Sequence, residues 1–290
     1  MKKTLVGLVA LLNLFFLQPV HAEKNKSIVI IDTSIDTSSV KIAHEVCIMS
    51  VKKCPNQKKF MEGPGAATLP KNQHYVNNFD HGTKVALVAK EVNPKVDIIF
   101  IRVVSRTDDG LLGYYSDKEL IMSINWILKN KEKFNIVSMS YSHGIQELSY
   151  NKTESCPTYS TTALLKNKIN ELKIVGIPSF FSSGNQSDKF LINYPACISD
   201  GIAVGAVDQF EKNTTYGNES PDLDFYALGN YYINNQYLYG TSFSAAAMSA
   251  LWSKSFIGSY DLTYNYLKAV SENSKISINT LFYNAEVVQR

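Results

Sequence analysis

Apolar residues along the chain follow two alternating patterns, short β-branched runs and longer segments with helical spacing. The run at 27–32 predicts a strand that ends in a carboxylate, and the segment Ser116-Asp117-Lys118-Glu119 has the form of a helix capping box. Further strands are predicted at 96–104, 135–140, 173–182 and 201–207, and further helices at 160–172 and 241–251. This alternation predicts an α/β fold with a mostly parallel sheet and helices on both faces.

The first residues have the three-part pattern of a secretory signal peptide. Lys2 and Lys3 precede an apolar run at 5–17, and Val20-His21-Ala22 offers small residues for cleavage. A transmembrane anchor is the alternative, but the apolar run is shorter than the ~20 residues that a span needs. We therefore expect residues 1–22 to be a signal peptide and the mature chain to be periplasmic or secreted.

The composition is that of an ordinary globular protein. Of the 290 residues, 45% are hydrophobic and 19% are charged, which excludes a disordered, collagen-like or coiled-coil chain. The formal net charge is +3, from 29 Lys and Arg against 26 Asp and Glu. So small a charge gives no support for binding to nucleic acid or to an anionic membrane. No internal repeat or linker-like segment interrupts the chain, so we expect one domain at 23–290.

Four cysteines are present, Cys47, Cys54, Cys156 and Cys197, and none forms a Cys-x-x-Cys pair. In an oxidising compartment an even number predicts two disulfide bonds. Four cysteines allow three pairings. One of these joins Cys47 to Cys54 across a short loop and Cys156 to Cys197 between two loops. Free buried thiols are the alternative.

Three short segments carry residue types that can act together chemically. Asp32 ends a predicted strand, His81 begins His-Gly-Thr-Lys-Val-Ala, and Ser242 lies in Gly-Thr-Ser at the start of an Ala-rich helix. Each residue alone is an ordinary strand-end or helix-capping residue. A serine nucleophile, however, needs a base to take its proton, and the base needs a carboxylate to hold it. Because strand ends and helix starts meet along one edge of an α/β sheet, the three groups can converge.

In the order Asp…His…Ser, these segments resemble those of the subtilisin-like serine proteases, the subtilase family. A fourth segment, Phe181-Ser182-Ser183-Gly184-Asn185, resembles the family's small-small-Gly-Asn piece, and 202–207 resembles the strand that follows it. The resemblance runs from about residue 28 to about residue 251, which is most of the chain. It implies the subtilisin-like form of the α/β fold.

The resemblance also implies a serine endopeptidase whose active site is formed by residues of these four segments. Ser242 would be the nucleophile, His81 the general base and then the general acid, and Asp32 the carboxylate that orients His81. The Asn185 amide and the Ser242 N–H would hold the oxyanion. Two walls would bind the backbone of a protein or peptide substrate. The residues implied for substrate binding are Ser140, Tyr141 and Ser142, opposed by Gly110, Leu111, Leu112 and Gly113, with Ser183 and Gly184 beside Asn185.

The sequence departs from the family pattern at several positions. Ser34, Asp80 and Ser142 stand where Gly is common, and Ala246 stands where Pro is common. None of these changes removes a reacting group. Only residues 23–31 separate the predicted cleavage point from Asp32, which leaves no room for the family's folded prodomain. We therefore expect either unaided folding or a folding partner that acts in trans, and we predict no metal or cofactor.

Two other functions share parts of this pattern. An α/β-hydrolase esterase would place its serine in Gly-x-Ser-x-Gly, whereas residues 240–244 read Gly-Thr-Ser-Phe-Ser. Its catalytic residues would also follow the order Ser…Asp…His, whereas the order in this chain is Asp…His…Ser. A secreted pseudo-protease would bind a peptide or a partner protein without cleaving it. The joint presence of Asp32, His81, Asn185 and Ser242 favours the enzyme, and labelling by a fluorophosphonate would separate the two.

Overall fold

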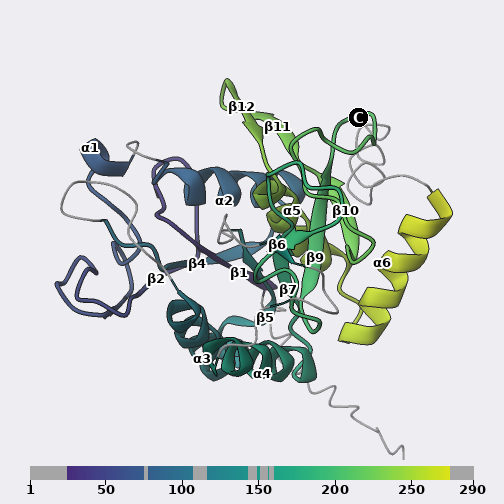
Figure 1. The fold of residues 1–290 in the computed structure, drawn as a ribbon. Coiled ribbons are helices and arrows are strands. Elements are labelled where there is room, and N and C mark those ends of the chain that lie inside the picture. The colour runs from purple at the N-terminus through teal and green to yellow at the C-terminus, as the bar shows by residue number, and fades with distance from the viewer. Residues whose placement is uncertain are drawn as a thin grey trace, which may run out of the picture.

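A central sheet of eight strands organises the computed structural model, which describes residues 25–74, 78–106, 116–142, 149–150, 156 and 160–274 (Figure 1). In spatial order the strands are β10 (Phe225–Leu228), β9 (Ile202–Val207), β7 (Ser179–Ser182), β5 (Ile136–Tyr141), β1 (Ser27–Asp32), β4 (Asp97–Arg102), β2 (His44–Ile48) and β3 (Phe60–Glu62). All neighbours pair in parallel except β2 and β3. The predicted, mostly parallel α/β sheet is confirmed.

Helices cover both faces of this sheet, because alternate residues of its central strands are apolar on both sides. Ile28 and Ile30 of β1 pack with helices α2 (His81–Val92) and α5 (Thr241–Ser255) on one face. Val29 and Ile31 pack with α3 (Asp117–Phe134) and α4 (Ser160–Ile174) on the other. Figure 1 shows these two layers above and below the sheet. Helix α6 (Tyr260–Ser274) lies at the β10 edge, where Leu267 packs near Phe225.

The predicted elements are present, with shifted ends. The capping box at Ser116 is confirmed, since its side chain accepts from the backbone of α3 and Glu119 reaches back to it. The strand expected at 173–182 is shorter than predicted. Helix α4 continues to Ile174, and Gly176, with φ of +86°, turns the chain before β7 starts. The structure also contains elements that were not predicted, among them β2, β3, β10, α6 and the short helix α1 (Lys71–His74).

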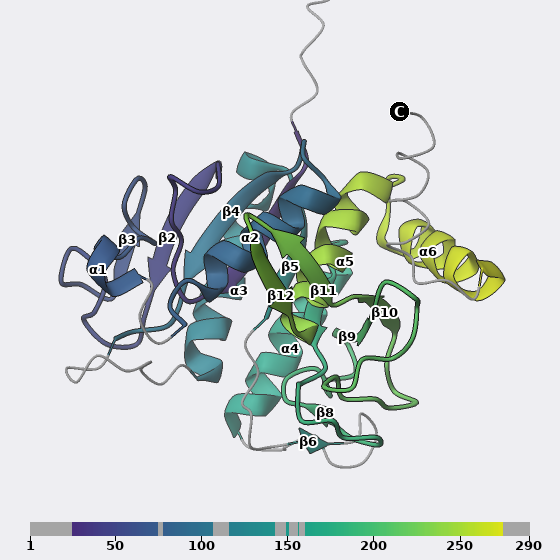
Figure 2. The ribbon, with the colours of Figure 1, turned by 90° about the horizontal axis from the view of Figure 1, so that it is seen from above.

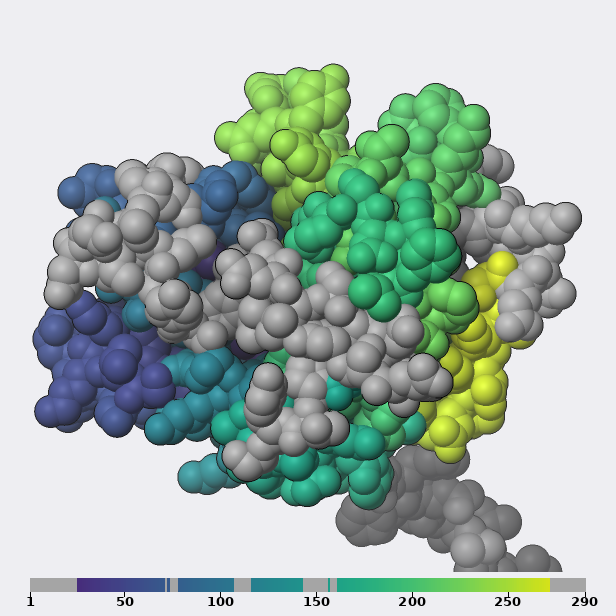
Figure 3. Space-filling view, in the orientation of Figure 1, coloured from purple at the N-terminus to yellow at the C-terminus, as the bar shows by residue number. Residues whose placement is uncertain are grey.

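A β-hairpin leads into α5 and so positions its first turn. Strands β11 (Asn230–Ile233) and β12 (Gln236–Tyr239) are joined by two asparagines with positive φ, the backbone form of a tight hairpin turn. At the base of the hairpin, Gly240 N–H donates to Gly229 O over 3.0 Å. Figures 1 and 3 show the hairpin projecting from the top of the molecule, directly over α5. A second small pair consists of β6 (Ser149–Tyr150) and β8 (Ile192–Asn193).

The two predicted disulfide bonds form, one between Cys47 and Cys54 and one between Cys156 and Cys197. The first closes the loop that follows β2, and the second ties the residue Cys156 to the segment before β9. The predicted signal peptide at 1–22 lies outside the described residues. Within the described ranges, none of the helices has the length and apolar character that a membrane crossing requires.

Candidate active site

Asp32 ends β1, in the middle of the sheet, and its carboxylate is fully buried. Its Oδ1 atom accepts hydrogen bonds from the Thr33 backbone N–H at 2.7 Å and from His81 Nδ1 at 2.8 Å. Because a carboxylate only accepts, the bonded Nδ1 carries a proton. The tautomer that leaves Nε2 able to accept a proton is therefore the one that this contact favours.

The loop after β1 fixes the start of α2 and with it His81. Thr33 Oγ1 accepts from the Gly82 N–H at 3.0 Å, and Thr33 and Ser34 both donate to Phe79 O, at 2.8 and 2.7 Å. A Cβ atom on Gly82 would lie 2.4 Å from the Phe100 ring and 2.7 Å from Ser34 O, so only glycine fits here. Ser34, which departs from the family pattern, thus contributes a hydrogen bond that positions the residues before His81.

Asp80, the second departure, forms an ion pair with Lys84 at 2.8 Å, one turn along α2. Its carboxylate also faces His81 closely enough to affect it, as a minor contribution. Burial lowers the pKa of the His81 imidazole, whereas the charge of Asp32 and its hydrogen bond raise it. The raising effects prevail, so the pKa of His81 lies above its ordinary value.

This shift predicts the acid limb of activity. A base must be neutral to accept a proton, so kcat/KM is expected to rise with pH through one ionisation above ~6.5, the ordinary pKa of histidine. The measurement is kcat/KM on a fluorogenic peptide as a function of pH. A profile that stays flat down to about pH 5 would show that His81 is not the base.

Ser242 is the second residue of α5 and is 8% exposed. Its hydroxyl donates to Ser142 O at 2.7 Å, and Ser142 Oγ donates in return to Ser242 O at 3.2 Å. The ring of Phe243, the next residue, lies 5.9 Å from the His81 ring, centroid to centroid. The first turn of α5 is thereby held between β5 and the imidazole.

Asn185 follows β7 on a turn that glycine permits, since Gly184 has φ of +114°. Thr241 donates to Asn185 Oδ1 twice, from its backbone N–H and from Oγ1, each at 3.0 Å. A backbone N–H only donates, so the atom that it meets is the amide oxygen. The Asn185 amide N–H₂ is therefore not bonded to Thr241, and it lies beside Gly240, where an added Cβ atom would be 3.4 Å from Nδ2.

The predicted wall residues lie in two places. Ser140 and Tyr141 are buried at the end of β5, which is paired on both sides, with β1 and with β7, as far as Tyr141. Ser142 is the first residue of this segment beyond those ladders. Ser183 donates to Asn218 O at 3.0 Å, and Gly184 N–H donates to Thr241 Oγ1 at 3.2 Å. Gly110, Leu111, Leu112 and Gly113 lie outside the described residues.

Three further residues position the site and were not among the predicted site residues: Thr33, Thr241 and Phe243. Thr33 and Thr241 stand next to Asp32 and Ser242, and their hydroxyls connect the strand ends to the helix starts. Because both residues lie inside the motifs of Asp32 and Ser242, the sequence could have suggested that they position the site. Among the residues that the structure describes, no group of three His, Cys, Asp or Glu side chains could hold a metal ion.

An Asp–His pair and a helix-start serine lie along the carboxyl edge of a parallel α/β sheet. The chain belongs to the subtilase family, whose model matches residues 23–280. The predicted resemblance is confirmed.

Relatives by sequence are proteases. The thermostable alkaline protease of Halalkalibacterium halodurans is 27% identical over 193 residues, which cover 61% of this chain and 47% of that protein. The minor extracellular protease Epr of Bacillus subtilis is 25% identical, over 64% of this chain and 28% of its own length. Subtilisin E of the same species is 24% identical, over 57% of this chain and 41% of its own. The chain thus spans less than half the length of each of these relatives.

Solved structures share the fold. A protease from Pseudoalteromonas arctica superposes with a TM-score of 0.63 at 18% identity, over 85% of this chain and 83% of that one. The nisin leader peptidase NisP from Lactococcus lactis gives a TM-score of 0.59 at 18% identity, over 85% and 82%. At these identities the likeness establishes the subtilisin-like architecture.

Proposed function

We propose that this chain is a secreted serine endopeptidase that hydrolyses peptide bonds with Ser242, His81 and Asp32. The observation that carries the proposal is the 2.8 Å contact from His81 Nδ1 to buried Asp32, with the start of α5 packed beside the same imidazole. Hydrolysis of a denatured protein by the purified chain, with the new termini read by mass spectrometry, tests it. Intact substrate after prolonged incubation would contradict it.

The nucleophile must change partner before it reacts. In the structure the Ser242 hydroxyl donates to Ser142 O, so it has to rotate about its Cα–Cβ bond toward His81. His81 then takes the hydroxyl proton on Nε2 while Ser242 Oγ bonds to the substrate carbonyl carbon. The imidazolium that forms is stabilised by Asp32 and later gives its proton to the leaving amine. Water, activated by the same histidine, completes hydrolysis of the acyl-enzyme.

The oxyanion of the tetrahedral intermediate would be held by two donors. One is the Ser242 backbone N–H at the start of α5, where helix N–H groups have no partner inside the helix. The other is the Asn185 amide N–H₂. The two bonds from Thr241 hold the amide oxygen, and so prevent the group from turning its acceptor toward the developing negative charge.

Asn185→Ala should lower kcat by ~10²–10³ with little change in KM, the order measured for the oxyanion asparagine of subtilisin. The amide N–H₂ bonds only to the charged oxygen that forms during reaction, so its loss leaves ground-state binding in place. Steady-state kinetics on one peptide substrate measure this. Lys189→Ala, on an exposed residue four positions further along that pairs with Glu219, is the control and should keep kcat within about threefold. A loss confined to KM would make Asn185 a binding residue instead.

We further propose export with removal of residues 1–22. The signal-like sequence pattern and the two disulfide bonds support it, because disulfides persist in oxidising compartments. The intact mass of the protein recovered from its natural host tests this. A chain that starts at residue 23 is expected, and a chain that retains the first 22 residues would overturn it.

A pseudo-protease is the competing function, and the two functions predict different results when the protein is treated with a fluorophosphonate. It would bind peptides but leave a fluorophosphonate unreacted, because no base would raise the nucleophilicity of Ser242. Peptide binding without labelling would therefore establish the binder and exclude the peptidase.

A further inference from the structure

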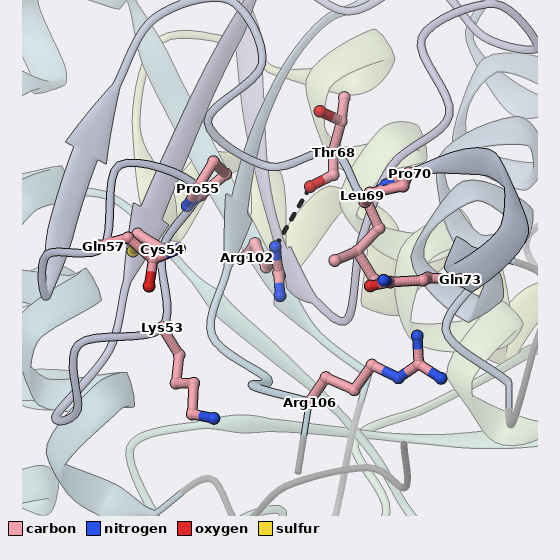
Figure 4. A pocket seen from close by; sticks show the side chains of 10 residues that line it. All are labelled: Lys53, Cys54, Pro55, Gln57, Thr68, Leu69, Pro70, Gln73, Arg102 and Arg106. Atoms are coloured by element: carbon pink, nitrogen blue, oxygen red, sulfur yellow. Dashed lines mark hydrogen bonds between the residues drawn. The ribbon is translucent and has the colours of Figure 1, made fainter. Parts of the chain in front are cut away.

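A basic pocket of about 520 Å³ lies at the end of β4, the strand that pairs with β1 (Figure 4). Its walls are the loop that the Cys47–Cys54 disulfide closes and the segment from Thr68 to Gln73. Figure 2 shows β2, β3 and α1 gathered on this side of the sheet, next to β4 and α2. The described lining contains three cationic side chains and no acid; the three are Lys53, Arg102 and Arg106.

Arg102 is the central residue of the pocket. Its side chain is 2% exposed, yet Figure 4 shows its guanidinium standing in the middle of the lining residues. Nε donates to Val104 O and one terminal nitrogen donates to Thr68 O, both at 3.2 Å. Two of the five guanidinium N–H donors are therefore used, and both meet neutral carbonyls.

The charge of Arg102 is not balanced by a carboxylate among the described residues. Burial alone lowers its pKa to about 10, with no acid to raise it, so the group stays protonated near neutral pH. The nearby acid Glu45 accepts instead from the backbone of Gly65 and Ala67, both at 3.0 Å. A buried charge without a counter-charge is costly, and an anion bound in the pocket would remove that cost.

The pocket is also well placed for a peptide in the active site. Arg102 is the register partner of Asp32 in the β1–β4 ladder, so both residues end their strands at the same edge of the sheet. Arg106 lies four residues before Gly110, in the segment that leads to one predicted substrate wall. The pocket and Asp32 therefore share the carboxyl edge of the sheet.

From the uncompensated Arg102 and the flanking Lys53 and Arg106, we propose that this pocket is a subsite for the carboxylate of an acidic residue in the peptide substrate. The inference rests on the proposed peptidase function for the identity of the ligand. An Asp or Glu side chain would accept the free N–H donors of Arg102 in the paired geometry that a guanidinium offers to a carboxylate. Lys53 and Arg106 would add charge at the mouth.

Binding is tested first in full-length Ser242→Ala, where catalysis plays no part. The probe is fluorescein-labelled hexaglutamate, measured by anisotropy at ~0.15 M salt, with hexaglutamine as the uncharged reference. Hexaglutamate should bind more tightly, and Arg102→Gln should weaken it by about 10-fold or more, the loss of a charge-assisted hydrogen bond. Equal binding of the two peptides would overturn the proposal.

Two sets of control variants distinguish binding in the pocket from nonspecific binding to a basic surface. Lys58→Gln removes an exposed charge four residues after Cys54, outside the lining, and should leave binding within about twofold. Lys53→Gln and Arg106→Gln, at the mouth, should each weaken it by several-fold, about one screened charge. They keep the test decisive if Arg102→Gln does not fold. An equal loss in Lys53→Gln and Lys58→Gln would show a diffuse basic surface and overturn the subsite.

The active enzyme then links the pocket to cleavage. A peptide library digested by the full chain should show Asp or Glu enriched at a fixed distance from the cut, and Arg106→Gln should reduce that enrichment. Cleavage without enrichment would overturn the subsite and leave the peptidase standing. Tight hexaglutamate binding without cleavage would refute the proposed function and keep the anion site. Equal binding of inorganic phosphate, with no enrichment, would assign the pocket to a free anion and overturn the substrate role.

Discussion

Replacement of Ser242 by alanine is expected to lower kcat by about 10⁶-fold, the order measured for the nucleophile of subtilisin, a member of the same family. The loss is so large because Ser242 would supply the hydroxyl that forms the acyl-enzyme: His81 and Asp32 remain in the variant, but they have no hydroxyl of their own to activate. The measurement is single-turnover hydrolysis of a fluorogenic peptide by purified wild type and variant, with unfolding monitored in parallel.

Ser244→Ala is the matched control for this loss. Ser244 lies two residues further along α5, is buried, and donates to Ala227 O at 3.1 Å, away from His81. The variant should lose some stability, about 1 kcal/mol for one buried hydrogen bond, but keep kcat within about tenfold. If Ser242→Ala retained more activity than Ser244→Ala, the nucleophile would be misassigned.

Asp32→Asn is expected to lower kcat by about 10⁴-fold. The asparagine keeps the size of the side chain, but it can present an N–H to His81 Nδ1 and so stabilise the wrong tautomer. It also removes the charge that raises the pKa of His81, so whatever activity remains should have its acid limb at lower pH. Both effects are read from kcat as a function of pH.

Asp80→Asn is the control for the electrostatic part of that prediction. Asp80 also raises the pKa of His81, but as the smallest of the named contributions, and it makes no hydrogen bond to the ring in the structure. Its acid limb should therefore move less than that of Asp32→Asn, with kcat nearly unchanged. A larger shift in Asp80→Asn would contradict the assignment of Asp32 as the partner of His81.

The sequence predicted the parts of this fold that follow from regular patterns. The β-branched run at 27–32, the capping box at Ser116 and the small residues at 241–251 each matched the element that formed. These signals are local, and their alternation predicted the parallel α/β class but not the order of the strands in the sheet. The hairpin of β11 and β12 was missed because its tyrosines are exposed and its strands show no clean alternation of buried positions.

The site was predictable as segments but not as contacts. Asp32 and His81 were paired from motif order, and the structure brings them to 2.8 Å. That Ser142 O would hold the Ser242 hydroxyl, or that Thr241 would orient Asn185, depends on side-chain directions that a motif does not encode. Arg102 is the clearest case. It stands in an apolar run that predicts a buried strand, and only the structure shows that its guanidinium faces a pocket.

The most direct test of the central claim is to label the native chain with a fluorophosphonate and locate the adduct by mass spectrometry of its peptides. A serine activated by the His81–Asp32 pair should give one adduct, on Ser242. The adduct should be absent from Ser242→Ala and greatly slowed in His81→Ala, which keeps the hydroxyl but loses the base. An unlabelled native protein, or an adduct on another serine such as Ser142, would contradict the account.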